Sequence, residues 1–367
     1  MANTITNTIT LNITDDDVSN RRGVKFGYNI LKNNTIRSSV YDNDGFLQSF
    51  CPLSSESLNA FFTDDVLNEN IRVEEFVEGT MINLYHDKDT WFVSTKNSVG
   101  GENNFYINGK QKQKSFKQMF YECCHEVNIN VENLDKTYVY SFVMQHTDNR
   151  IINPVMNNSL YLISAYVKPY ESNPTSIEMI CDVKDLTHIM PLGSVCFPTQ
   201  YDLTTRNDII HRFAAPYTDY RIMGVNLFNT ETGGRSKIRN PPYEELKKLR
   251  GNQAKIEYHY LTLRKEGRVD EFIDFFPEYT EDFNYYESKI LNFTHTLYNN
   301  YVDCYMKHTM PLKQYDQKYK KHMYAIHDDY VKTKCKTDIS AIDDYIYKIP
   351  EAILMSSINY EYRVEKE

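Results

Sequence analysis

The sequence predicts an α+β protein of two domains, an antiparallel-sheet domain over residues 20–240 and an all-helical domain over residues 241–367. Before residue 240, paired runs of β-type residues are separated by turns, which indicates strands joined by hairpins and therefore an antiparallel sheet. After the Pro-Pro dipeptide at 241–242, apolar residues recur at three- and four-residue steps, the period of an amphipathic helix. This change of period places the domain boundary near residue 240.

The expected strands come in pairs. Residues 80–85 and 91–95 flank a short polar turn, residues 138–144 and 160–167 flank a longer loop, and residues 221–228 and 235–239 flank the turn TETGG at 230–234. Connections rich in Gly, Asp and Thr favour hairpins. A helix over residues 115–124 is expected to interrupt the strands.

The helical domain is predicted from two aromatic stripes and a cap. The second stripe covers residues 319–330, and Asp338 is expected to cap a helix that continues to residue 348. We interpret the stripes as core rather than as a ligand site, and expect His322 and His327 on their flanks to be satisfied by neighbouring groups. The first stripe consists of Phe283, Tyr286, Ile290, Phe293, Leu297, Tyr301 and Cys304.

Composition restricts the class of protein. Hydrophobic residues make up 41% and charged residues 25% of the 367 positions, as in globular proteins. No run approaches the ~20 apolar residues of a membrane span, and the first residues do not read as a leader, so we expect a cytoplasmic protein without a membrane partner. The adjacent Cys123, Cys124 and His125 lack the spacing of a zinc site and predict free thiols.

Charge is distributed unevenly along the chain. The net charge is −9, so bulk charge does not favour a nucleic-acid partner. Residues 235–268 nevertheless carry ten Lys or Arg against four Glu, a local charge of +6. A solvated helix face explains part of this run, and a surface facing phosphates explains its concentration.

Four segments in order resemble a known family. The first has RSSV at 37–40 and AFF at 60–62, and the second has FVEGTM at 76–81 and STKNS at 94–98. The third has YSFV at 140–143, NRII at 149–152 and LYLI at 160–163. The fourth has IMGV at 222–225 and KIR at 237–239, followed by Tyr243.

Together these segments resemble the phage-type RNA ligase 1 branch of the covalent nucleotidyltransferases, the superfamily of RNA ligases, DNA ligases and capping enzymes. The resemblance implies a nucleotidyltransferase-like sheet domain with a helical appendage. It also implies RNA as partner, and ATP and Mg²⁺ as cofactors. The Asn- and Tyr-rich composition fits a relative from a large DNA virus, for which the location would be the host cytoplasm or the virion.

The chain departs from the family at three chemically decisive positions. Phe76 stands where the family's lysine attacks the α-phosphate of ATP, and a phenyl ring offers no nucleophile. Ser141 and Met223 stand where the family has acids, and a thioether cannot replace a carboxylate as a Mg²⁺ ligand. The metal-ligand positions therefore do not support a metal site.

The positions that bind phosphate and sugar in the family are retained. The resemblance assigns Arg37, Lys96 and Arg150 to nucleotide or RNA-phosphate binding, together with three residues of the second and fourth segments, Glu78, Lys237 and Arg239. Lys237 and Arg239 alternate on one strand, so both should point to one face. Lys96 is not expected to replace the nucleophile, because the five residues between Met81, its expected neighbour, and Phe76 span about 16 Å.

Each retained position also has a structural interpretation. Glu78 can precede a glycine bulge at a strand entry, the cations at 237 and 239 can guard an edge strand, and Arg150 can support a turn. The leading hypothesis is an RNA-ligase-like protein that binds nucleotide or RNA ends and does not self-adenylylate. The alternatives are an active ATP-dependent RNA ligase with an unrecognised lysine, the sealing of pre-adenylylated RNA, and a virion structural or interaction protein that retains only the fold.

Overall fold

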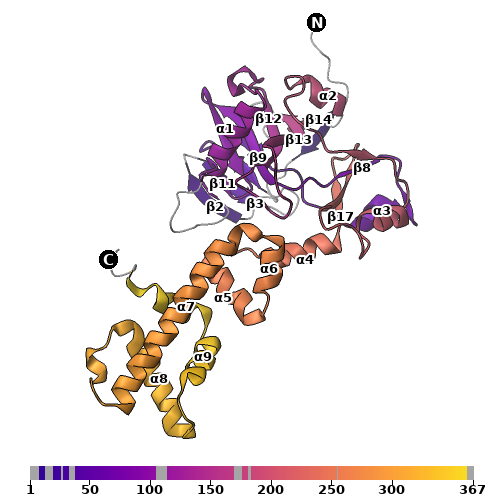
Figure 1. Cartoon of the computed structure of the whole chain (residues 1–367). Helices are drawn as coiled ribbons and strands as arrows, with labels where there is room; N and C mark the ends of the chain where they lie inside the picture. The colour runs from indigo at the N-terminus through magenta and orange to yellow at the C-terminus, as the bar shows by residue number, and fades with distance from the viewer. Residues whose placement is uncertain are drawn as a thin grey trace. The chain divides into compact units, whose positions relative to one another are not determined.

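The computed structural model describes residues 8–12, 20–25, 28–32, 38–104, 114–168, 176–180, 183–253 and 255–361. They form two compact units, of which unit 1 ends at Arg250 and unit 2 begins at Gly251 (Figure 1). Unit 1 contains antiparallel sheets and unit 2 is helical, so the predicted α+β class is confirmed. None of the described helices has the length and apolar character needed to cross a membrane.

The largest sheet described in unit 1, the first sheet, has seven antiparallel strands. Its spatial order is β1 (Thr8–Asn12), β14 (Ser176–Ile180), β13 (Ser159–Val167), β12 (Tyr138–Gln145), β9 (Thr80–Asp87), β10 (Thr90–Thr95) and β11 (Ser98–Val99).

A second sheet has the order β15 (Gln200–Tyr201), β8 (Ile71–Glu75), β16 (Gly224–Asn229) and β17 (Arg235–Arg239). A third sheet has the order β2 (Asn20–Lys25), β3 (Tyr28–Lys32), β4 (Ser39–Tyr41) and β5 (Leu47–Phe50), and a small hairpin joins β6 (Phe62–Thr63) to β7 (Val66–Leu67). The helices of unit 1 are α1 (Phe116–Glu126), α2 (Val183–His188), α3 (Arg206–Phe213), α4 (Pro241–Arg250) and the short 3-10 turns η2 (Leu58–Phe61) and η3 (Val131–Asn133).

Strand alternation gives the first sheet two buried faces. Ile82 and Leu84 of β9 point to the face that α1 covers, where Phe120 is fully buried. Tyr85 points to the other face and packs in a cluster with Phe50 of β5. The first sheet is therefore apolar on both sides, while the second sheet packs one side against α3.

The three predicted hairpins are present. β9 pairs with β10, β12 with β13, and β16 with β17. The last pair starts at Gly224 rather than at Arg221, because Asn240 Nδ2 donates to the carbonyls of Asp219 and Ile222 and holds those residues in a loop. The predicted helix at 115–124 is α1, which begins with a capping box between Ser115 and Gln118.

The two compact units divide after Arg250. Helix α4 buries Tyr243, Leu246 and Leu249 within unit 1. Its last residue, Arg250, is 4% exposed and donates from Nη2 to the carbonyl of Arg150 at 2.6 Å. The Pro-Pro dipeptide thus begins a helix that still belongs to the sheet unit, because proline is compatible with a first helical turn.

Unit 2 consists of α5 (Ile256–Glu266), α6 (Val269–Phe275), α7 (Thr280–Tyr301), α8 (Gln317–Thr333), α9 (Ile339–Lys348) and α10 (Glu351–Ile358), with a π-helical turn at Val302–Met306 and 3-10 turns at Pro277–Tyr279 and Leu312–Gln314. The Asp338 side chain accepts from Ala341 N, which confirms the predicted cap of α9. His322 is 1% exposed, and its ring nitrogens lie 2.8 Å from the hydroxyls of Tyr345 and Ser357. His322 is therefore a satisfied core histidine, as expected.

Candidate functional site

The candidate site lies on one face of the second sheet. Antiparallel register aligns three rows of side chains across β8, β16 and β17, since residues directly opposite share a face. The rows are Arg72–Phe228–Arg235, Glu74–Asn226–Lys237 and, just beyond the end of β8, Phe76–Gly224–Arg239. We call this side, with Arg72, Arg235, Lys237 and Arg239, the cationic face.

Phe76 is the centre of the third row. Its ring is half-buried, with Lys237 Nζ 4.3 Å and Arg239 Cζ 5.6 Å from the ring centroid. Both cations therefore lie over one ring, on the shared face that their alternation in the sequence predicts. Such contacts contribute about 0.5–1 kcal/mol each at exposed sites, enough to bias the two side chains toward the ring.

Gly224 allows Arg239 to approach the Phe76 ring. Its φ is +125°, and a Cβ there would lie 2.2 Å from the carbonyl oxygen of Ile238 on β17. No other residue fits so close to the neighbouring strand, and the missing side chain leaves room between Phe76 and Arg239. Gly79 is similarly restricted, with φ +152° and an added Cβ 2.5 Å from the carbonyl oxygen of Met144.

A buried polar chain supports the cationic face. Arg235 donates to Asn226 Oδ1 at 3.2 and 3.3 Å, and Asn226 Nδ2 donates to Glu74 Oε1 at 2.7 Å. Glu74 Oε2 also pairs with Arg72 Nε at 3.0 Å. A single buried carboxylate thus orders two arginines through hydrogen bonds. The sequence analysis did not predict this chain of hydrogen-bonded side chains. The polar residues at alternate positions 72 and 74, together with Asn226, were a signal that could have indicated it.

The acid of the second segment, Glu78, holds a loop. Its carboxylate is 8% exposed and accepts from Ile152 N at 3.1 Å and from Asn153 N and Nδ2 at 3.0 and 3.3 Å. Burial, and then the neighbouring Glu78 carboxylate, raise the pKa of Tyr243. The geometry places Glu78 among protein donors, as expected for a structural anchor.

The loop at 149–152 is likewise held by the protein. Asn149 Nδ2 donates to Thr80 Oγ1 at 2.8 Å, and Arg150 Nε donates to the carbonyl of Ile152 at 2.9 Å. The carbonyl of Arg150 in turn accepts from Arg250. These contacts match the expected turn-supporting role of Arg150.

The predicted site residues do not all come from one sheet. Lys96 lies in the turn between β10 and β11, two residues past the last β9–β10 pair, Ser94 with Asn83. Lys237, by contrast, comes from β17 and lies over the Phe76 ring. Arg37 lies outside the described residues.

The positions that hold acids in the family do not fit a divalent metal. Ser141 is fully buried on β12 and donates to Asn83 Oδ1 at 2.8 Å, while Asn83 Nδ2 lies 3.2 Å from Cys51 Sγ. The side chain of Met223 offers only a thioether sulfur as a ligand. A hard cation prefers several oxygen ligands, so these side chains do not form a Mg²⁺ or Mn²⁺ site.

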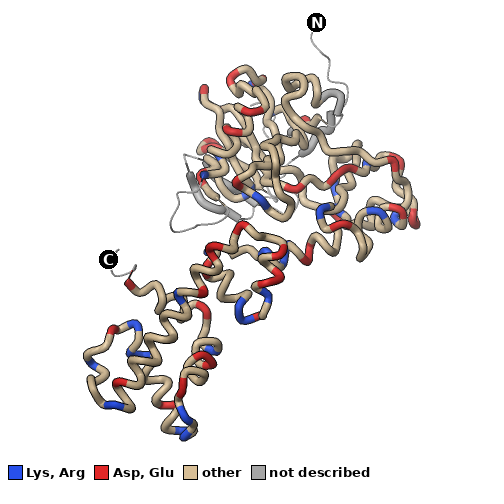
Figure 2. Tube along the Cα trace, in the orientation of Figure 1, with Lys and Arg blue, Asp and Glu red and all other residues tan. Residues whose placement is uncertain are grey.

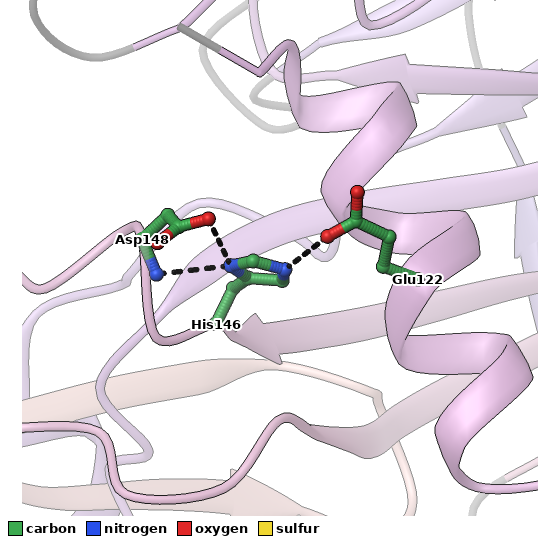
Figure 3. A group of neighbouring side chains, drawn as sticks. All are labelled: Glu122, His146 and Asp148. Atoms are coloured by element: carbon green, nitrogen blue, oxygen red, sulfur yellow. Dashed lines mark hydrogen bonds and ion pairs between the residues drawn. The ribbon is translucent and has the colours of Figure 1, made fainter.

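A separate polar cluster joins Glu122 of α1 to His146 and Asp148 beyond β12 (Figure 3). His146 Nε2 lies 3.0 Å from Glu122 Oε2, and Nδ1 accepts from the backbone N–H of Asp148 at 3.0 Å. Lys114 Nζ lies 2.7 Å from Glu122 Oε2 and 3.0 Å from Asp148 Oδ2. Both ring nitrogens of His146 and both carboxylates therefore have partners. The Lys114 ammonium group lies between the two carboxylates, where a metal cation would otherwise be held.

The +6 run at 235–268 belongs to both units, and at least five of its ten cations form ion pairs with carboxylates. In unit 1, Arg239 pairs with Glu244 at 2.7 Å and Lys248 with Glu245 at 2.8 Å. In unit 2, Arg268 pairs with Glu271 at 2.7 Å. Figure 2 shows acidic residues interspersed with the basic ones in both units. Glu244 and Glu245 are already counted in the charge of +6, so among these three pairs only Glu271 brings a further acid to the run.

The chain is similar to known proteins only at low sequence identity. No family model matches the chain. The immediate-early protein ICP-46 homolog of invertebrate iridescent virus 3 is 22% identical over 250 residues, a match that covers 66% of this chain and 52% of the relative. The chain therefore spans about half the length of this curated relative. Its viral source agrees with the expected viral relative.

Similar solved structures include RNA ligases. An archaeal ATP-dependent RNA ligase is 11% identical, with 73% of this chain and 72% of that chain covered and a TM-score of 0.40. A mutant of Naegleria gruberi RNA ligase with ATP and Mn is 12% identical, with 48% and 51% covered and a TM-score of 0.31. Since both scores are low, the fold description rests on the strands and helices themselves.

Proposed function

We propose that unit 1 binds nucleotides or RNA ends by their phosphates on the cationic face and does not form a covalent nucleotidyl-lysine. The observation that carries the proposal is the Phe76 ring with Lys237 and Arg239 above it. A phenyl ring at the family's nucleophile position cannot attack ATP, whereas two cations beside it suit an anionic group.

Glu244 indicates how a phosphate could be accepted. Its carboxylate lies 2.7 Å from Arg239 Nη1 and 3.8 Å from Lys247 Nζ, so it already neutralises the exposed edge of the cationic face. A phosphate carries more charge and more acceptor oxygens than a carboxylate, and can displace it from Arg239. Binding through this face needs no metal ion, in agreement with the poor fit of Ser141 and Met223 to one.

The contact between Lys237 and the Phe76 ring supports a second candidate function, an active ATP-dependent RNA ligase. Among the lysines that the structure describes, Lys237 has an amine 4.3 Å from the ring at the family's nucleophile position. In that mechanism, the deprotonated amine would form an N–P bond at the α-phosphorus of ATP. The bond from that phosphorus to pyrophosphate would break, pyrophosphate would leave, and the amine proton would pass to solvent.

Labelled ATP separates the two candidates. We expect no acid-labile label on the wild-type chain after incubation with α-labelled ATP and Mg²⁺. A stoichiometric label that Lys237→Ala abolishes would establish the second candidate and overturn the first. The sealing of pre-adenylylated RNA is measured in parallel, because that step needs no enzyme nucleophile.

Binding of RNA ends is tested with 5′-phosphorylated and 5′-hydroxyl strands of the same sequence. The wild type should prefer the phosphorylated strand, and Lys237→Ala with Arg239→Ala should remove the preference and flatten the salt dependence by about one to two units. Lys247→Ala with Lys248→Ala, on the exposed side of α4, is the matched control and should change affinity less. Equal loss in both double variants would indicate diffuse attraction. No binding at low salt would favour a structural protein that retains only the fold.

A further inference from the structure

Unit 2 carries an irregular turn at the end of α7. The π-helical turn Val302–Met306 is closed by a hydrogen bond of 2.9 Å from Lys307 N to the carbonyl of Val302, five residues back. It positions Tyr305 so that its ring lies on His327 of α8, with centroids 3.9 Å apart and planes at 12°. π-turns are uncommon and are frequent at functional sites, so what this one presents is informative.

The turn completes a stack of aromatic rings anchored in the core. His327 stacks in turn against Tyr330, with centroids 5.9 Å apart and planes at 29°. Tyr301 is 2% exposed, lies 5.2 Å from Tyr305 between ring centroids, and has its hydroxyl 3.5 Å from His327 Nδ1. The buried Tyr301 thus anchors the stack in the core, and the outer rings of the stack face solvent.

The outer rings are unusually open. Tyr330 is 39% exposed and Tyr324, one turn earlier on the helix than His327, is 66% exposed. Single exposed rings are common on protein surfaces, but stacked rings on one helix and on the turn packed against it, with a further exposed tyrosine one turn away, are typical of a binding surface. We call Tyr305, Tyr324, His327, Tyr330 and the adjacent Lys334 the aromatic surface of unit 2.

The segment that carries this surface is rich in lysine. Residues 302–336 contain eight Lys and four Asp, a local charge of +4 in a chain of net charge −9. Lys307 and Lys332 pair with acids on their own segments. Lys334 Nζ instead lies 5.8 Å from the centroid of the Tyr330 ring, and within the described residues neither it nor Lys336 forms an ion pair. Figure 2 shows basic residues along this end of unit 2.

We propose that the aromatic surface of unit 2 is a binding site for single-stranded nucleic acid. Exposed rings offer faces on which unpaired bases can stack, and neighbouring lysines attract the phosphates between them. A duplex keeps its base faces inside, and an acidic peptide would use the lysines without the rings. This site lies in a different unit from the cationic face and goes beyond the proposed function.

The test uses the full-length chain and strands that lack a 5′-phosphate, so that end recognition by unit 1 does not contribute. Fluorescence anisotropy compares a base-bearing 12-nucleotide strand with an abasic strand of equal length, as RNA and as DNA. The wild type should bind the base-bearing strand at least about tenfold tighter, since stacking contributes about 1–3 kcal/mol per base. Equal affinity for the two strands, or no binding to either, would overturn the proposal.

Variants locate the site. Tyr324→Ala should weaken binding of the base-bearing strand about tenfold, and Tyr305→Ala with Tyr330→Ala should remove the preference over the abasic strand. Tyr330→Phe keeps the ring and should bind like the wild type. Tyr347→Ala is the matched control, because that tyrosine is 45% exposed and its hydroxyl donates to the backbone carbonyl of Lys265 on α5, away from α8. Since Tyr324 is the most exposed of these rings, its replacement should not unfold the unit, and a loss no greater than that of Tyr347→Ala would exclude the site.

Discussion

Replacing Glu78 by alanine tests whether this acid is a structural anchor or a ligand-binding group. The substitution removes the acceptor of two backbone N–H groups, those of Ile152 and Asn153, and of the Asn153 side chain. A buried donor left without a partner costs about 1–3 kcal/mol. With two backbone donors affected, we expect the free energy of unfolding of unit 1 to fall by about 3 kcal/mol.

The chain contains a built-in probe for this measurement. Its single tryptophan, Trp91, is 7% exposed in the core of unit 1, so its fluorescence during urea unfolding reports on that unit. Glu78→Gln keeps one carbonyl oxygen to accept from the two backbone groups and should lose only about 1 kcal/mol. Wild-type stability of Glu78→Ala together with loss of nucleotide binding would refute the structural role and restore the ligand role that the sequence resemblance implies.

Three further predictions concern other positions. Phe76→Lys should not restore ligation, as measured by sealing of 5′-phosphorylated RNA, because the positions of the metal-binding acids still lack carboxylates; robust sealing would show that the later segments are misaligned. Burial lowers the pKa of His322 to about 4, below the 6.5 of an exposed histidine. Stability is therefore present above pH 6.5 and lost toward pH 4, by about 2 kcal/mol between pH 7 and pH 5, and His322→Phe should remove this dependence in urea titrations followed by helix circular dichroism. Gly224→Ala should destabilise unit 1 by more than about 3 kcal/mol in the tryptophan assay, because its Cβ would meet the Ile238 carbonyl. Gly193→Ala is the control, because Gly193 has φ +74° and no atom near an added Cβ, so this variant should lose only the backbone strain of about 1 kcal/mol. Equal losses of stability in Gly224→Ala and Gly193→Ala would contradict the steric argument.

Local features of the fold could be predicted because their causes are close together in the chain. The capping box at Ser115, the cap at Asp338 and the β9–β10 hairpin each depend on residues within a few positions of one another. The aromatic stripe of α7 follows from helical period alone, but the π-turn after Tyr301 does not, because a changed hydrogen-bond step leaves no signature in apolar spacing.

The description of the candidate site needed both the sequence and the tertiary structure. Strand alternation in the sequence predicted that Lys237 and Arg239 share a face, and the resemblance to the RNA ligases implied that Phe76 stands at the nucleophile position and that Ser141 and Met223 stand at positions of acids. Only the tertiary structure decided that these cations lie over the Phe76 ring and that Glu78 is occupied by residues of a distant loop. The reason is physical: chemistry and period are properties of neighbouring residues, whereas the register that pairs β8 with β16 is chosen by packing between segments more than a hundred residues apart.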